Sequence, residues 1–318
     1  MKIFVTGASG YVGKVFLKRM IADPNIEKIF ALDAAEKPQG FDSPKISWIK
    51  ANLAVDKWEK NVPGQGEIDA VFHFAFWIRN PYGKVAETEK ENLESCRRVF
   101  EFCFKNNVKK LIYISSVAAY GARPENVGKI LKETDPLEEK SYPYGLQKKM
   151  VEEMLGEMIK KEKPQTQVFV LRPGSIWGPE GEKKKKLGLM VLLKRLLPVL
   201  PLVNPAWARQ YVHEQDLVDA MSLLAFKPIN SNFEIFNFAA PDILTTKDMA
   251  KLLNKRVIRV PFSLIKTAFF FSWHLTRGLL PTPPGAEMSF TWPINVDGSK
   301  INRFGFNYKH SSEQTFKS

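Results

Sequence analysis

The first thirteen residues constrain the fold of this 318-residue chain more than any other segment. Residues 2–6 form an apolar run typical of a buried strand, the segment TGASGYVG (6–13) follows, and a helical pattern begins after it. Strand, glycine turn and helix in this order predict a dinucleotide site, although an ordinary glycine turn has the same spacing. Gly7 permits the tight turn, Gly10 lets the backbone approach a pyrophosphate, and Gly13 lets the helix pack on the strand. The helix N-terminus offers free N–H groups to the phosphates.

An acidic residue at the end of the next expected strand indicates which nucleotide is bound. Residues 28–33 (KIFALD) fit that strand, and Asp33 ends it twenty residues after Gly13. A carboxylate there can accept hydrogen bonds from both ribose hydroxyls of an adenosine and would repel a 2′-phosphate, so it favours NAD over NADP. Two alanines follow where an NADP site would carry arginine, whereas Lys37 leaves NADP open. A strand-end aspartate that only caps a turn is the alternative.

Strand and helix patterns alternate through the first half of the chain. Apolar runs predict strands at residues 2–6, 28–33, 45–50, 70–74, 110–115 and 167–172, with one more at 233–237. Helical spacing lies between them at residues 14–21, 86–106 and 144–161. This alternation predicts an α/β fold with a doubly wound parallel sheet, the Rossmann fold.

A change in composition after Pro173 predicts a second lobe. Residues 174–208 hold a lysine run and a leucine-rich helical pattern, and residues 241–318 are rich in aromatics and prolines. We therefore expect an NAD-binding Rossmann domain at 1–173, with 209–240 returning to it. A smaller C-terminal substrate-binding lobe would comprise 174–208 and 241–318.

A tyrosine and a lysine four residues apart are candidates for acid/base chemistry. Tyr144 and Lys148 would share one face of a helix, as many solvated pairs also do. The ordinary tyrosine pKa, near 10, is too high for a base at neutral pH. The charge of Lys148 together with a cationic nicotinamide would lower that pKa. Tyr144 could then exchange a proton with a substrate hydroxyl, and Lys148 could also hydrogen-bond the nicotinamide ribose.

Ser116 is the third candidate. It follows an apolar strand, and parallel sheets of this type bind ligands at the carboxyl ends of their strands. Ser116 can hydrogen-bond the substrate oxygen that Tyr144 deprotonates. A serine that only forms a turn at the end of a strand is the alternative.

These segments together resemble a known family. In order along the chain stand TGASGYVG (6–13), Asp33, VFHFA (71–75), Asn92, YISSVAAYG (113–121), YGLQK (144–148), LRPGSIWGP (171–179) and RQYVHEQD (209–216). With these motifs the chain resembles the extended short-chain dehydrogenase/reductase superfamily, in its NAD-dependent epimerase/dehydratase family, from Lys2 to about Asp219. The resemblance implies a bound NAD that is reduced and reoxidised, and a catalytic set formed by Ser116, Tyr144 and Lys148.

The resemblance also implies which residues bind each molecule. NAD would be held by Gly7, Gly10, Tyr11, Val12, Gly13, Asp33, Asn52, Leu53, Phe74, Ala75, Tyr144, Lys148 and Pro173. Ser116 and Arg209 would contact the substrate, since Arg209 matches an arginine that contacts the pyrophosphate in nucleotide-sugar enzymes. Asn52 stands where the family usually has aspartate, and an amide can still donate and accept hydrogen bonds near the adenine. No metal site is expected.

Departures from the family pattern narrow the reaction. Dehydratases carry a Thr-Asp-Glu run where this chain has Ser116, Val117 and Ala118, and the last two cannot transfer protons. We therefore expect an NAD-dependent epimerase, acting on a nucleotide sugar by transient hydride transfer to NAD. An NAD-dependent dehydrogenase or reductase of a bulkier alcohol or ketone, such as a sterol, is the alternative. A non-catalytic cofactor sensor is least favoured, because Tyr144 and Lys148 are both retained.

The net charge and the cysteine content limit which partners and which cellular compartment we expect. The formal net charge of +13 suits an anionic small-molecule substrate, and the lysine run at 183–186 is either a solvated loop or a local attractor for it. No nucleic-acid-binding module accompanies the charge, so we expect no nucleic-acid partner. Two cysteines lie seven apart on one expected helix, too far to bridge. Together with the absence of a signal peptide before the first strand, they predict a reduced, cytoplasmic protein.

Two further segments concern membranes and oligomers. Residues 261–280 are apolar for about one bilayer thickness, but Lys266, His274 and Arg277 interrupt them. We expect an amphipathic helix that packs on the C-terminal region without stable membrane insertion, and peripheral membrane contact stays open. The helices expected at 86–106 and 144–161 could pair into a homodimer. Their apolar residues are either that interface or part of the core: Val99, Phe100, Phe102, Phe104, Met150, Met154 and Leu155.

Overall fold

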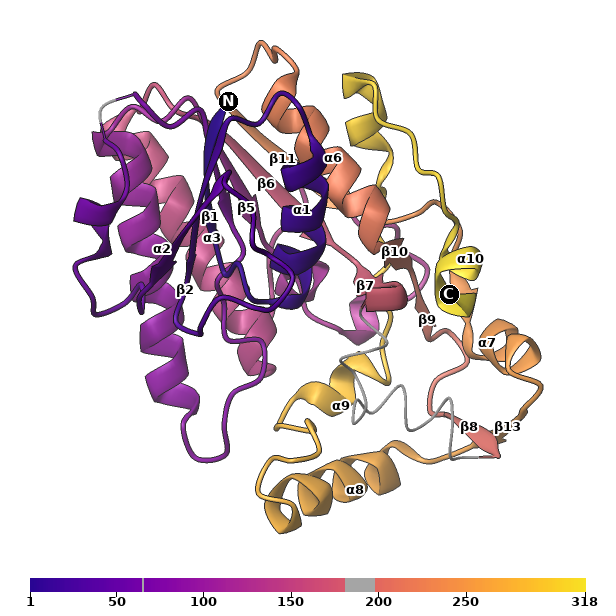
Figure 1. The fold of residues 1–318 in the computed structure, drawn as a ribbon. Coiled ribbons are helices and arrows are strands. Elements are labelled where there is room, and N and C mark those ends of the chain that lie inside the picture. The colour runs from indigo at the N-terminus through magenta and orange to yellow at the C-terminus, as the bar shows by residue number, and fades with distance from the viewer. Residues whose placement is uncertain (65, 181–197) are drawn as a thin grey trace.

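The computed structural model describes residues 1–64, 66–180 and 198–318 (Figure 1). The lysine run at 183–186 and the leucine-rich pattern before Pro198 lie outside these residues. The described chain places a single large sheet between two layers of helices, and smaller strand pairs and helices follow toward the C-terminus.

The sheet is doubly wound, as the sequence predicts. Its seven strands are all parallel and lie in the order β11-β6-β5-β4-β1-β2-β3. Their bounds are β1 (Lys2–Thr6), β2 (Lys28–Asp33), β3 (Ile46–Lys50), β4 (Ala70–His73), β5 (Lys110–Ile114), β6 (Gln167–Pro173) and β11 (Phe233–Phe238). Each bound lies within one residue of the expected strand. The chain winds outward from β1 in both directions, so the Rossmann fold is confirmed and the ligand crevice falls between β1 and β4.

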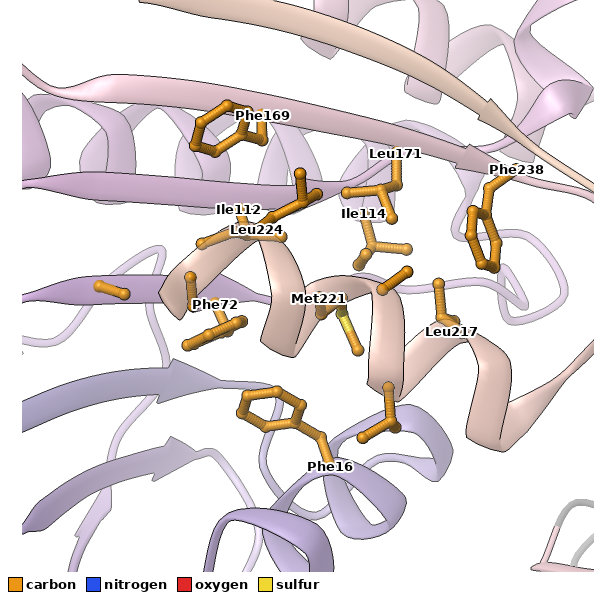
Figure 2. Packing of buried hydrophobic residues seen from close by; sticks show 14 of the residues in the cluster. Phe16, Phe72, Ile112, Ile114, Phe169, Leu171, Leu217, Met221, Leu224 and Phe238 are labelled. Atoms are coloured by element: carbon orange, nitrogen blue, oxygen red, sulfur yellow. The ribbon is translucent and has the colours of Figure 1, made fainter. Parts of the chain in front are cut away.

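Helices cover both faces of the sheet. One face carries α1 (Tyr11–Ala22) and α6 (Glu214–Phe226), and the other carries α2 (Val85–Lys105) and α3 (Pro143–Glu162). Figure 2 shows the first face, where Phe16 of α1 and Met221 of α6 pack toward Phe72 of β4. The rings of Phe16 and Phe72 are 4.3 Å apart. Because both faces are covered, strands such as β1 are apolar on both sides.

The start of one helix differs from its predicted position by more than any strand boundary does. The helices α2 and α3 lie within one residue of their expected ranges, but α1 begins at Tyr11, three residues earlier than expected. The N-cap is Gly10, so Gly13, the last glycine of the turn, already lies inside the helix. A glycine costs about 1 kcal/mol in a helix interior, which is why the pattern alone placed the start later.

The remaining elements are short. Three strand pairs lie outside the main sheet: β7 (Ser175–Trp177) with β10 (Tyr211–His213), β9 (Ala208–Arg209) with β12 (Leu244–Thr245), and β8 (Val199–Leu202) with β13 (Arg256–Arg259). The late helices are α7 (Thr246–Leu252), α8 (Phe262–Leu275), α9 (Ala286–Ser289) and α10 (Ser312–Lys317). Single 3₁₀ turns occupy Trp58–Asn61, Val117–Tyr120, Pro124–Asn126 and Ser299–Phe304. A small apolar cluster around Trp177 and Tyr211 holds part of this region together. The division into two domains stays a prediction.

The helix α8 differs from the amphipathic helix expected at 261–280. It packs through Phe269, whose ring lies 5.2 Å from that of Phe290, and through Trp273. It therefore packs on the C-terminal region as expected, but it also exposes apolar residues such as Phe271 and Leu275, so its outer surface is less polar than that of a typical amphipathic helix. Within the described residues, every helix is too short or too polar to span a bilayer.

The apolar residues considered for a dimer interface belong mostly to the core of the chain itself. Five of the seven are fully or almost fully buried in the monomer: Val99, Phe100, Phe102, Phe104 and Leu155. For these five the alternative, burial in the core, holds, whereas Met150 and Met154 are only partly buried. A homodimer remains a prediction and would have to use other side chains of α2 and α3.

Candidate active site

The carboxyl ends of the central strands open into a cavity of about 760 Å³. Residues that follow β1, β2, β4, β5 and β6 form one side of it, and residues between 281 and 296 form the other. All of the expected site residues line this cavity: Gly7, Gly10, Tyr11, Val12, Gly13, Asp33, Asn52, Leu53, Phe74, Ala75, Ser116, Tyr144, Lys148, Pro173 and Arg209. The fold therefore brings them together, while the role of each stays a prediction.

The glycine turn has no room for side chains. Gly7 has a φ of +68°, and a Cβ there would lie 2.4 Å from the backbone nitrogen of Ala75. A Cβ on Gly13 would lie 2.3 Å from the carbonyl oxygen of Gly7. Gly10 is the N-cap of α1 and makes no side-chain cap, and the first turn of this helix lines the cavity. This geometry suits the pyrophosphate of a dinucleotide.

Asp33 is fixed where β2 ends at the cavity. Its Oδ2 accepts a hydrogen bond from the backbone N–H of Ser9 at 2.8 Å, and its Oδ1 accepts one from Ala35 at 3.0 Å. The carboxylate thus joins the glycine turn to the turn after β2. Each oxygen has a second lone pair, so the carboxylate can still accept the hydroxyls of a ribose.

The catalytic candidates meet at the wall formed by β5 and α3. The helix α3 begins with Pro143 at a first-turn position that tolerates proline, and it carries Tyr144 and Lys148 one turn apart toward the cavity. Ser116 follows β5 and shares a hydrogen bond with Tyr144. Its hydroxyl also accepts the N–H of Ala118 at 3.1 Å, so Ser116 forms the expected turn at the strand end as well.

Tyr144 stays protonated at neutral pH in the chain alone. Burial raises its pKa to about 12, and the hydrogen bond with Ser116 opposes this shift only in part. The prediction of a lowered pKa invoked Lys148 and the nicotinamide together. The bound cofactor is part of that condition, so the lowered pKa stays a prediction for the enzyme with NAD bound.

Lys148 is held away from solvent, with 3% of its surface exposed. Its Nζ donates hydrogen bonds to the carbonyl of Ile114 at 2.7 Å and to the hydroxyl of Tyr113 at 3.3 Å. Burial lowers the pKa of Lys148 to about 7, while Cys96 and Glu152 oppose the shift. Near neutral pH this lysine is therefore close to half protonated.

Phe76 is a cavity residue that the sequence did not single out. The Nζ of Lys148 lies 3.6 Å from the centre of the Phe76 ring, and the Tyr144 ring meets it edge-on at 5.9 Å. A cation over an aromatic face is stabilised, so Phe76 positions both catalytic candidates. It follows VFHFA (71–75) directly and has the appearance of one more apolar residue of the strand.

A second group missed from the sequence lies behind the wall. Arg172 of β6 donates to both carboxylate oxygens of Glu152, with the Nη2 to Oε2 distance at 2.6 Å, and its Nη1 donates to the Tyr120 hydroxyl at 2.6 Å. The hydroxyl of Ser115 also donates to Glu152. Glu152 lies one turn after Lys148 on α3, so this ion pair fixes the helix that carries the catalytic candidates.

We expect Lys148 to give the protein a stability that rises with pH. Its pKa is about 7 when folded against 10.5 for an exposed lysine, so the unfolded state binds more protons between these values. Relative to the Lys148→Met variant, the free energy of unfolding of the unmodified protein should rise by roughly 1 kcal/mol per pH unit from about pH 7 to pH 9. Urea denaturation at several pH values measures this. Parallel profiles for the two proteins would contradict the shifted pKa.

Comparison with known proteins decides the family. The model of the NAD dependent epimerase/dehydratase family matches residues 3–239. The chain belongs to this family. A relative from Escherichia coli, N-acetyl-alpha-D-glucosaminyl-diphospho-ditrans,octacis-undecaprenol 4-epimerase, is 25% identical over 270 residues, which are 82% of this chain and 76% of the relative. As a family member, the protein is an NAD-dependent enzyme.

Solved structures of the same fold agree with the assignment. The UDP-glucose 4-epimerase of Thermotoga maritima, solved with UDP-glucose, aligns with a TM-score of 0.74 at 20% identity and covers 100% of this chain and 96% of its own. The UDP-glucuronic acid 4-epimerase of Bacillus cereus, solved with UDP-glucuronic acid and NAD, aligns with a TM-score of 0.75 at 17% identity. This alignment covers 100% of this chain and 97% of the Bacillus cereus chain. At these identities the likeness concerns the fold.

The residues of this epimerase/dehydratase-family enzyme fit NAD. The glycine turn leaves backbone exposed for the pyrophosphate, and Asp33 presents carboxylate oxygens for the adenosine ribose. Phe74, Ala75 and Pro173 line the same cavity. NAD, when bound there, supplies the oxidising and reducing power of the reaction.

Replacing Asp33 tests the nucleotide preference of the enzyme. The Asp33→Asn variant should bind NAD about tenfold more weakly or worse, because a charged acceptor becomes neutral and loses one of its two oxygens. NADP binding should weaken less or improve, since the repulsion of its 2′-phosphate is removed. Titration calorimetry with both nucleotides measures this. Asp42→Asn, at an exposed aspartate outside the cavity, is the matched control, and equal losses in both variants would refute the assignment.

Another wall of the cavity is aromatic and carries Arg209. Arg209 donates to the carbonyl of Ser289 at 3.1 Å, and its guanidinium lies 5.3 Å from the Trp207 ring. Phe290 and Trp292 line the same wall. Arginine presents a fork that matches phosphate oxygens, so this wall can receive an anionic substrate.

Proposed function

We propose that the protein is an NAD-dependent epimerase that inverts one secondary alcohol carbon of a sugar linked to a nucleoside diphosphate. The observation that carries the proposal is that Ser116, Tyr144 and Lys148 meet at one wall of the cavity whose glycine turn and Asp33 fit NAD. Arg209 lines the same cavity. A single cavity thus offers a site for the cofactor, a proton-transfer group and an anion-binding group.

The chain's own part in the reaction is proton transfer and orientation. Tyr144 would take the proton of the substrate hydroxyl on its Oη and return it when the hydroxyl forms again. Ser116 would donate a hydrogen bond to the same substrate oxygen. Lys148, when protonated, would stabilise the phenolate of Tyr144. Because the phenol's pKa is raised to about 12 in the chain alone, this charge and that of the bound nicotinamide are needed for deprotonation.

The cavity wall supports epimerisation over dehydration. Val117 and Ala118 line the cavity where dehydratases need an acid and a base, and neither side chain can carry a proton. Inversion needs only that the keto sugar present its other side, and a cavity of about 760 Å³ leaves room for that turn. The named relatives act on sugars carried by a diphosphate, which supports the same substrate class.

Aromatic residues of the cavity favour a second candidate. Trp77, Tyr142, Phe290 and Trp292 all line it. Such a wall would also suit an NAD-linked dehydrogenase or reductase of a bulkier, apolar alcohol or ketone. The two candidates differ in whether reduced cofactor leaves the site.

Incubation with NAD and a panel of UDP-sugars tests the proposal. We expect a sugar epimer to form, detected by proton NMR, without stoichiometric NADH in the absorbance. NADH that accumulates in step with product would instead favour the dehydrogenase. If NAD binds and no sugar nucleotide is turned over, the epimerase proposal fails.

A further inference from the structure

The helix α8 has two apolar faces, and within the described residues one of them packs on the protein while the other is exposed. Its inner face is formed by Ile265, Phe269 and Trp273, and the last two are buried. Figure 1 shows α8 along the lower edge of the molecule, away from the seven-stranded sheet. A helix at a protein surface normally turns polar residues to solvent. The other face of α8 therefore calls for an explanation.

That other face, the outer stripe, is apolar along its whole length. It consists of four exposed residues at helical spacing: Leu264, Ala268, Phe271 and Leu275. The exposed fractions of Leu264, Phe271 and Leu275 are 56%, 53% and 80%. Leu279, just beyond the helix, is also 80% exposed. A contiguous exposed stripe of this kind marks an interaction surface.

The outer stripe belongs to a helix that contacts the rim of the active-site cavity. Tyr82, in the loop before α2, hydrogen-bonds Nδ1 of His274 at 2.8 Å and packs on the Trp273 ring at 5.7 Å. The same loop carries Trp77 and Ile78, which are half or more exposed and also line the cavity. Whatever covers the outer stripe therefore lies close to the entrance of the cavity.

The chain segment that carries the stripe is cationic, although the helix α9, which packs on α8, holds Glu287. Residues 249–286 contain no aspartate or glutamate, and their cationic residues are Lys251, Lys255, Arg256, Arg259, Lys266 and Arg277. Cationic side chains beside an apolar helical face are typical of helices that lie in the plane of an anionic membrane surface. A second copy of the chain would bring the same positive charges together across a twofold interface. The charge pattern thus favours a lipid surface over self-association.

We propose that α8 docks in the plane of an anionic lipid bilayer, with the outer stripe inserted at the headgroup boundary and the surrounding lysines and arginines on the lipid phosphates. Only one face of α8 would insert into the bilayer, which agrees with α8 being too short to span it. Docking would bring the loop that carries Trp77, Ile78 and Tyr82 near the membrane, because this loop contacts α8.

Vesicle flotation tests the proposal with the whole protein. The protein should float with vesicles of phosphatidylcholine and phosphatidylglycerol at a ratio of about 2:1, and at least about tenfold less with phosphatidylcholine alone. The double variant Phe271→Glu/Leu275→Glu should bind the mixed vesicles at least about tenfold more weakly. Its NAD binding and thermal unfolding midpoint should stay unchanged, since neither residue lines the cavity.

A matched control separates a specific surface from general stickiness. Phe233→Glu removes an exposed phenylalanine at the amino end of β11, on the sheet edge opposite the cavity, and should leave vesicle binding unchanged. The proposal is overturned if the protein does not float with the mixed vesicles, or if the double variant floats as well as the unmodified protein. It is also overturned if sedimentation reveals a dimer that the double variant abolishes, because the stripe would then be an interface between copies.

Discussion

The Tyr144→Phe variant is expected to lose turnover by about a thousandfold, the typical contribution of a positioned acid/base group. The substitution removes only the phenolic oxygen, whose hydrogen bond with Ser116 sets it at the cavity wall. The aromatic contact with Phe76 and the packing of the ring are retained. The measurement is the turnover number for epimerisation of whichever UDP-sugar the enzyme accepts, together with NAD affinity by calorimetry.

A neighbouring tyrosine supplies the control. Tyr142 also lines the cavity, with its ring 6.0 Å from that of Tyr144, but its hydroxyl has no assigned role in proton transfer. Tyr142→Phe should lower turnover less than about tenfold, and both variants should keep NAD affinity within a few-fold. If Tyr144→Phe turns over within tenfold of the unmodified enzyme, the acid/base role is refuted.

The sheet could be read from the sequence because its strands are buried on both faces. Continuous apolar runs such as Lys2–Thr6 and Gln167–Pro173 have no other stable place in a protein of this size. The pairs β7–β10, β9–β12 and β8–β13 could not be read, since each strand has only two to four residues. Their partners lie some 35 to 57 residues away along the chain, so local pattern carries no trace of them.

The same distinction holds for the site: residues fixed by local sequence pattern were predictable, and residues that depend on long-range packing were not. Gly7, Asp33 and Tyr144 were predictable, because the turn, the strand end and the helix that hold them are each local. Phe76 and Arg172 were not, because their meaning arises only when β4, β6 and α3 pack together. The rise that burial causes in the pKa of Tyr144 was not predictable for the same reason, because the extent of burial is a property of the fold.

Removal of Arg172 is expected to destabilise the enzyme by about 3–5 kcal/mol. Arg172 and Glu152 are both almost fully buried, and the arginine donates to both carboxylate oxygens. Arg172→Met would leave the carboxylate inside the protein with the Ser115 hydroxyl as a partner and without the arginine that pairs with it. The free energy of unfolding in urea at neutral pH measures the loss. The double variant Arg172→Met/Glu152→Met should recover most of it, because two apolar side chains replace the pair.

An exposed pair on the same helix separates this effect from the general value of an ion pair. Lys160 and Glu157 of α3 are 2.9 Å apart, and both side chains are largely exposed. Lys160→Met should cost less than about 1 kcal/mol. A comparable cost for Lys160→Met and Arg172→Met would mean that burial does not govern the pair. A large cost for Arg172→Met alone would show that the support of α3, and with it the position of Tyr144 and Lys148, depends on a charge that lies behind the cavity wall.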